Sequence, residues 1–185
     1  MTRYDTFSDI SCVIADKKTA FSVALSLPMM VEEVLTWLYS EKGMDFFQEG
    51  LGRFQKEQGV VLCHESCYHQ RLTYFNYYFL FQMQSNENQR PIDCYFEKSS
   101  SALQDRVSGL SEPVFSIFRL VKANKNVTIL KDLLHKKRKY RIQNGRVMME
   151  YLERHSIIQG FLFDCQSRFV LGDGFLIHPA HILKP

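Results

Sequence analysis

The sequence predicts an α+β fold, in which a helical N-terminal region packs on a small, strongly curved antiparallel sheet or open barrel. Hydrophobic residues recur at helical spacing before Pro113 and come in short, strand-like bursts after it. The charge reverses at the same place: residues 1–113 hold 10 Lys and Arg against 15 Asp and Glu, whereas residues 114–185 hold 13 against 5. We therefore expect a mainly helical, acidic region at 1–113 and a basic, β-rich region at 114–185, either as two domains or as one composite domain.

The composition indicates an ordinary globular core and no membrane segment. Of the 185 residues, 45% are hydrophobic and 14% aromatic, which favours a tightly packed core of large side chains. No apolar stretch approaches the roughly 18 residues of a membrane span, and the first residues, MTRYDTFSDISC, do not resemble a secretory signal. We expect a cytoplasmic protein whose five cysteines are mostly reduced and buried.

Two helices are predicted first. Pro28 suits a first helical turn, where its missing N–H costs nothing, and the apolar spacing that follows is helical until Gly43. Asp45 then caps a shorter helix that ends at Gly59.

The most aromatic segment is 66–83, and its apolar side chains cover every face of a helix. Such a helix is normally buried on most sides, so we expect it to be central. A short helix opened by Pro91 and another at 103–110 follow. The pattern breaks at Ser111–Pro113.

The C-terminal region reads as short strands separated by turns. Residues 114–121 are rich in β-branched and aromatic side chains, which favour a strand. Five further strands are expected at 127–130, 138–142, 157–163, 168–171 and 175–177. So many short strands with tight turns are typical of a small, curved sheet or barrel.

The order of segments from Phe75 to Pro179 resembles a family of uncharacterised bacterial proteins. The resemblance rests on an aromatic helix, a Pro-opened helix, a "Ser-x-Phe" strand, a strand ending in Asp-Leu-Leu, and a final Gly-Asp-Gly-Phe-Leu-Ile-His-Pro. Some members of that family carry a cysteine-rich zinc-binding tail, and this sequence has no such stretch. The resemblance therefore implies the helix-then-barrel layout, and it implies no activity and no zinc site.

The densest cluster of reactive side chains is Cys63-His64-Glu65-Ser66-Cys67-Tyr68-His69. On a helix, Cys63 and Cys67 would share one face and could bind zinc with a histidine. His69 follows His64 by five residues instead of the four of a His-Glu-x-x-His metalloprotease, about 100° off the required face. No second pair of ligands exists, so these four residues are weak candidates for a metal site or a cysteine nucleophile. We expect no metal and no cofactor.

The strongest indication of a binding surface is a basic run. It comprises Lys136, Lys137, Arg138, Lys139, Tyr140 and Arg141. On a strand, Lys137, Lys139 and Arg141 would share one face. Such a stripe could hold an acidic protein by charge with Tyr140 packing against it, or follow a phosphate backbone with Tyr140 stacking on a base.

Two structural explanations compete with a binding role for this run. Lys and Arg at a sheet edge are a common guard against edge pairing. The acidic N-terminal region could also neutralise the run within the chain.

The function predicted from these features is non-catalytic. We expect a cytoplasmic binding or adaptor protein whose basic surface engages an acidic protein partner or a second copy of the chain. The alternative is a nucleic-acid-binding protein using the same stripe, and a metal- or cysteine-dependent enzyme at Cys63–His69 is a distant third. No membrane contact and no small-molecule substrate are expected, and the sequence has no Gly-x-Ser-x-Gly motif, no Gly-rich phosphate loop and no dinucleotide-binding fingerprint.

Overall fold

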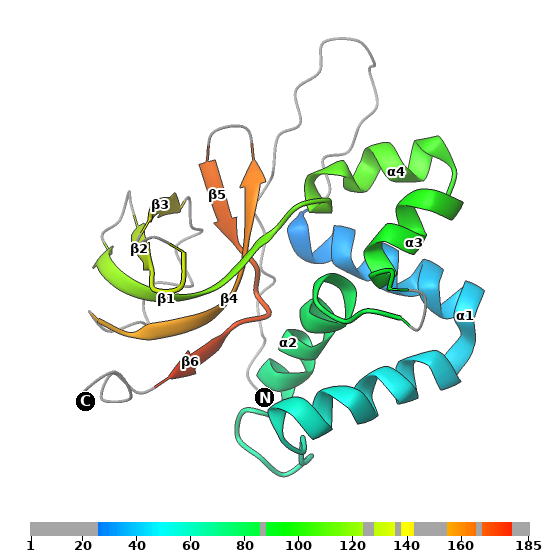
Figure 1. Ribbon diagram of the computed structural model, residues 1–185, viewed down its shortest axis with the longest axis horizontal. Coiled ribbons are helices and arrows are strands. Elements are labelled where there is room, and N and C mark those ends of the chain that lie inside the picture. The colour runs from blue at the N-terminus through cyan, green and yellow to red at the C-terminus, as the bar shows by residue number, and fades with distance from the viewer. Residues whose placement is uncertain are drawn as a thin grey trace, which may run out of the picture.

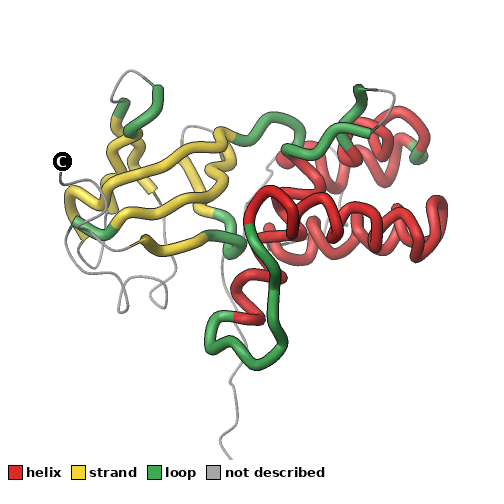
Figure 2. Tube along the Cα trace, turned by 60° about the horizontal axis from the view of Figure 1, so that its bottom comes forward, coloured by secondary structure: helices red, strands yellow, loops and turns green. Residues whose placement is uncertain are grey.

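Helices form one half of the molecule and strands the other (Figure 1), and a second view keeps the two groups apart (Figure 2). The predicted α+β class is confirmed, since the helices pack against a closed five-stranded barrel with one additional strand. The computed structural model describes residues 26–85, 88–123, 128–135, 138–142, 155–165 and 168–178.

The helices begin and end close to the residues that the sequence signals mark. They are α1 (Leu27–Gln58), α2 (Tyr68–Phe81), α3 (Pro91–Lys98), α4 (Ser101–Val107) and the short 3-10 helix η1 (Ser108–Leu110). The two helices predicted before residue 60 are the two parts of α1, which kinks at Gly43, where the backbone is not helical (φ 77°, ψ 178°). None of the helices in the described ranges is both long and apolar enough to cross a bilayer.

The strands close into a barrel. They are β1 (Val114–Ala123), β2 (Thr128–Asp132), β3 (Lys139–Ile142), β4 (Ile157–Cys165), β5 (Arg168–Leu171) and β6 (Leu176–His178). The order β1-β2-β3-β5-β4 is completed by pairing of β4 with β1, and β6 extends the free part of β4. The other four pairs of this closed five-stranded ring are antiparallel, so β3 and β5 run in the same direction, and the barrel is mixed instead of wholly antiparallel.

The interior of the barrel is filled by one face of each of its strands. Its buried side chains are Phe118, Leu120, Leu130, Tyr140, Ile142, Ile158, Leu162 and Leu171. Since side chains alternate along a strand, the residues between these point outward.

Part of the outer face of the barrel packs on α2. The ring of Phe161, on β4, lies 5.9 Å from that of Tyr77 and 5.7 Å from that of Phe81. The Phe163 ring lies 5.4 Å from Phe81. All four side chains are fully buried, which confirms the prediction of a central aromatic helix.

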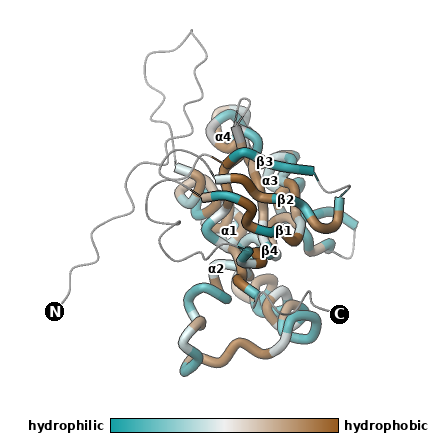
Figure 3. The backbone as a smooth tube through the Cα atoms, turned by 90° about the vertical axis from the view of Figure 1, so that its left-hand side faces the viewer, coloured by the Kyte–Doolittle hydropathy of each residue, from teal (hydrophilic) through white to brown (hydrophobic). Residues whose placement is uncertain are grey.

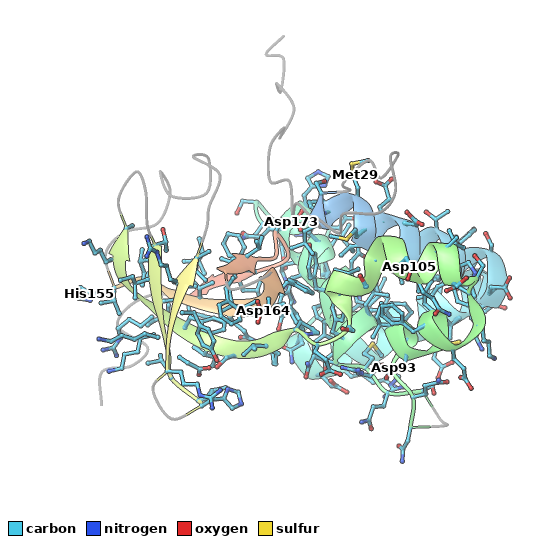
Figure 4. All side chains as sticks on the ribbon, turned by 90° about the horizontal axis from the view of Figure 1, so that it is seen from above. Met29, Asp93, Asp105, His155, Asp164 and Asp173 are labelled. Carbon is cyan, nitrogen blue, oxygen red and sulfur yellow. The ribbon has the colours of Figure 1, made fainter. Side chains whose placement is uncertain are left out.

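The loop Gly172-Asp173-Gly174 fits around Tyr77. A Cβ at Gly172 would lie 2.6 Å from the Tyr77 ring, and one at Gly174 would lie 2.3 Å from the ring and 2.8 Å from the Thr73 carbonyl oxygen. The Tyr77 hydroxyl donates a hydrogen bond to the Asp173 carboxylate. Burial, and then the Asp173 charge, raise the pKa of Tyr77 well above its usual value, so the phenol stays a donor. Figure 4 shows Asp173 at this junction of strands and helices.

A second polar contact fixes β4 and β6 to α2. The Gln159 amide donates to the Tyr74 hydroxyl at 2.7 Å, and His178 Nε2 lies 2.9 Å from the Gln159 carbonyl oxygen. Because that oxygen can only accept, His178 is protonated on Nε2. Burial raises the pKa of Tyr74 to about 12, although the bond from Gln159 opposes the shift.

The close approach at Gly174 gives a stability prediction. Gly174→Ala should lower the free energy of unfolding by about 2 kcal/mol, because the added methyl must displace either a fully buried ring or the α2 backbone. Gly109→Ala is the control: nothing lies within 4 Å of its Cβ position, and stability should be unchanged or slightly raised. Urea unfolding of both variants makes the comparison, and equal midpoints would contradict the tight fit.

Candidate functional site

The Cys63–His69 cluster lies in turns and at the first residues of α2, not along one helix face. Both thiols are exposed, so the expectation of buried cysteines is wrong for Cys63 and Cys67, whereas Cys94 is buried. His64 and His69 are exposed as well. Within the described ranges, no three His, Cys, Asp or Glu side chains gather as ligands for a metal ion.

Arg71 explains how this segment folds. Its guanidinium donates to the carbonyl oxygens of Gln58, Gly59 and Val60 at 2.8–3.0 Å and pairs with Glu65 at 3.2 Å. Arg71 thereby satisfies carbonyl groups that the end of α1 leaves without helical partners. The arrangement is a structural one, which holds the loop against α2.

The residues of the predicted basic run differ in their exposure to solvent. Arg138, Lys139 and Arg141 are exposed, and Lys136 and Lys137 lie outside the described residues. Tyr140 is 7% exposed and points into the barrel. The expected packing or stacking of Tyr140 on a partner is therefore wrong.

Tyr140 is buried because it alternates with two outward cations on β3. Its ring lies 6.0 Å from that of Phe118 and 4.8 Å from that of Phe169, both edge-on. Lys139 and Arg141 consequently share the outer face, as predicted.

Strand register joins these cations to others into two rows. Arg119 on β1 is opposite Lys131 on β2, which is opposite Lys139 on β3. In the second row, Lys122 is opposite Ile129, which is opposite Arg141. Adjacent strands are about 5 Å apart and the rows about 7 Å apart, so the five cations lie on three sides of Ile129. We call Arg119, Lys122, Lys131, Lys139 and Arg141 the cationic face.

A bulge in β1 completes the second row. The register shifts by one residue between Leu120 and Lys122, so that Lys122 takes the place opposite Ile129 that Val121 would hold in an unbroken ladder. A one-residue shift moves a side chain to the other face of a sheet. The bulge therefore brings Lys122 to the outside of the barrel.

The cationic face lies away from the acidic helices. β2 and β3 occupy the side of the barrel opposite α1–α4 (Figure 1), and Figure 3 looks onto β1–β3, where hydrophilic and hydrophobic stretches alternate. Among the described residues, the carboxylates that form ion pairs do so with Arg71, Arg90 and His135. None of these three belongs to the cationic face, so no described carboxylate of the helices neutralises it.

Asp132 fixes the turn that leads from β2 toward β3. Its fully buried carboxylate accepts hydrogen bonds from Ser116 Oγ at 2.5 Å and from the amides of Leu134 and His135 at 2.9 and 2.8 Å. His135 Nδ1 lies 3.2 Å away. Burial opposes ionisation, but these hydrogen bonds, led by that of Ser116, outweigh it and hold the pKa of Asp132 below its usual value.

Ser116, Asp132 and His135 do not form a catalytic triad. The Ser116 hydroxyl is fully buried and donates to Asp132, so it is neither accessible nor activated by the histidine.

Sequence reasoning missed Arg119. The signal was its position between the inward-facing Phe118 and Leu120, which places it outside the barrel. Its alignment with Lys131 and Lys139 depends on strand register, which one sequence does not reveal.

No protein-family model matches the chain, and no curated protein or solved structure is significantly similar to it.

The row Arg119–Lys131–Lys139 gives a second prediction. Like charges directly opposite destabilise a sheet, so Lys131→Gln should raise the free energy of unfolding by about 0.5 kcal/mol at low salt. The gain should shrink near ~1 M salt, where the screening length is about 3 Å. Lys56→Gln, at the C-terminal end of α1, removes the same charge from a position where it favours the helix and should leave stability unchanged or slightly lower. Loss of stability in Lys131→Gln at low salt would show that Lys131 makes a stabilising contact instead.

The Asp132 carboxylate gives a pH prediction. Asp132→Asn should lower the free energy of unfolding by about 1–3 kcal/mol at neutral pH, because the uncharged amide oxygen accepts more weakly than Oδ1 and the amide nitrogen in place of Oδ2 cannot accept from His135. A lowered folded-state pKa means that the carboxylate stabilises the fold above its unfolded pKa of about 3.9, and that this is lost as pH falls through the folded pKa. The difference in free energy of unfolding between wild type and variant should thus be constant near neutral pH and should become smaller below about pH 4.

Unfolding by urea over a pH series measures that gap. Asp164→Asn, which alters an exposed carboxyl on β4, should change stability by less than about 0.5 kcal/mol and serves as the control. A gap that stays constant down to acid pH would mean that the Asp132 charge contributes nothing.

Proposed function

We propose that this protein is a non-catalytic, cytoplasmic binding or adaptor protein whose cationic face engages an acidic segment of a protein partner. The observation that carries the proposal is the pair of cross-strand rows: the first places three cations opposite one another, and the second places a cation on each side of Ile129. Such an arrangement costs stability, and a partner that supplies carboxylates removes the repulsion. A sheet-edge guard needs no such alignment across three strands.

Apolar groups beside the cations favour a protein over a nucleic acid. Ile129 lies half-buried among the five cations, and Leu134, in the turn after β2, is 60% exposed. Sequence-tolerant binding of single strands uses aromatic platforms for the bases, and Tyr140 faces the barrel interior. An acidic peptide segment with an aliphatic side chain fits this combination of cations and apolar groups better than a nucleic acid does.

Binding assays with defined probes test the proposal. Fluorescence anisotropy should detect binding of a labelled Glu-rich peptide that contains one Leu. A peptide of the same length in which Gln replaces each Glu should bind far more weakly. Lys139→Gln/Arg141→Gln should weaken binding about tenfold, a loss near 1.4 kcal/mol. Lys56→Gln/Lys98→Gln removes equal charge from the helical half and should have little effect.

Three other outcomes would overturn the proposal. Tighter binding of duplex or single-stranded DNA, with a steep salt dependence lost in the same variant, would indicate a nucleic-acid-binding protein. Self-association at low salt that Lys139→Gln/Arg141→Gln abolishes would identify a second copy of the chain as the partner. Equal weakening by the two double variants would show that only net charge matters.

A further inference from the structure

A cleft on the helical half is distinct from the cationic face. It has a volume of about 220 Å³ and lies between the second part of α1, the C-terminal end of α2 and the start of α3. Its apolar wall is formed by Phe46, Phe79 and Met83, and its cations are Lys42, Arg53 and Arg90. Cys94 of α3, 6% exposed, also lines it.

Gly50 accounts for the form of the cleft. A Cβ at Gly50 would lie 2.6 Å from the Phe79 ring, so the glycine allows α1 to approach α2. Phe46 and Arg53, about one turn to either side of Gly50, also line the cleft. The Phe79 ring lies where a larger side chain at position 50 would extend, and it forms part of the cleft wall.

The charges of the lining are not balanced within the cleft. Arg90 forms a two-pronged ion pair with Asp93 at 2.7 and 2.8 Å, which compensates its charge. Arg53 Nη1 donates to the Gln84 carbonyl oxygen at 2.7 Å, which fixes the side chain and leaves other N–H donors of its guanidinium. Lys42 is exposed at the rim, and Glu49 is the single carboxylate in the lining.

We infer that this cleft binds a small amphipathic anion, an aromatic carboxylate of about ten non-hydrogen atoms. The ring would lie on Phe46, Phe79 and Met83, and the carboxylate would lie between Lys42 and Arg53. The volume is below the roughly 300–1,000 Å³ of sites for drug-sized ligands, which excludes larger molecules. An inorganic anion would leave the apolar wall in contact with water, and a neutral aromatic would leave Lys42 and the remaining N–H donors of Arg53 without an anionic partner.

Three probes separate the parts of this inference. Phenylacetate carries both the ring and the charge, 2-phenylethanol carries the ring, and acetate carries the charge. Titrations followed by the ¹³C-methyl NMR signal of Met83 should saturate with phenylacetate at an affinity at least tenfold above either other probe. Equal affinity for phenylacetate and 2-phenylethanol, or the absence of any saturable shift, would overturn the inference.

Alkylation of cysteines locates the site. Saturating phenylacetate should slow the reaction of Cys94 with iodoacetamide severalfold, while the exposed Cys63 and Cys67 serve as internal controls. Unchanged Cys94 reactivity together with an unchanged Met83 signal would show that any binding occurs elsewhere.

A pair of variants on one helix tests the charge. Lys42→Met should weaken phenylacetate binding five- to tenfold, whereas Lys56→Met, an exposed lysine of α1 outside the lining, should not. Equal affinity of the two variants would remove Lys42 from the site and overturn the anion assignment. None of these readouts involves the cationic face, so they test the cleft separately from the proposed function.

Discussion

The contact between Tyr77 and the Gly172-Asp173-Gly174 loop determines how the two halves of the molecule meet. The two glycines are required because the loop backbone lies against the ring and, at Gly174, against the α2 backbone as well. With the loop in this place, Phe161 and Phe163 on the outer face of β4 cover the same helix. A barrel attached along β4 must turn its remaining strands outward, and these are β2, β3 and the far end of β1.

Along the outer face of β1, the surroundings change from the helices to solvent within a few residues. Phe115 contacts Phe161 at 4.8 Å beside the helices, whereas Arg119, four residues further on the same face, belongs to the cationic rows. The repulsion among the cations acts on strands whose other face is fully packed. The buried side chains of the barrel interior and the hydrogen bonds of Asp132 offset the destabilising effect of this repulsion.

Much of the fold could be predicted from the sequence because its signals are local. Pro28 and Pro91 mark helix starts, and the change of period at Pro113 marks the first strand within one residue. Gly43 marks the end of the first of two predicted helices, and its backbone is indeed non-helical where α1 kinks.

The candidate sites were less predictable because they depend on contacts between distant segments. The alternation on β3 gives Lys139 and Arg141 a common face, and it also buries Tyr140, a consequence that sequence reasoning did not draw. The alignment of Arg119 with Lys131, the bulge that turns Lys122 outward and the cleft beside Gly50 all arise from pairing or packing across the chain. Period and composition carry no information about such pairings.

The placement of the charges also decides how the cationic face can be studied. Its side chains project from the outside of a barrel whose interior contains no described charge other than Asp132, which accepts hydrogen bonds from Ser116 and from its own turn. Replacing an outer cation therefore leaves the core and the attachment to α2 intact. A stabilising effect of such a change on folding, combined with a weakening effect on binding, has no explanation in packing. A binding surface should show these two opposite effects. The cations that repel one another in the free protein are the same groups that a partner's carboxylates would bind.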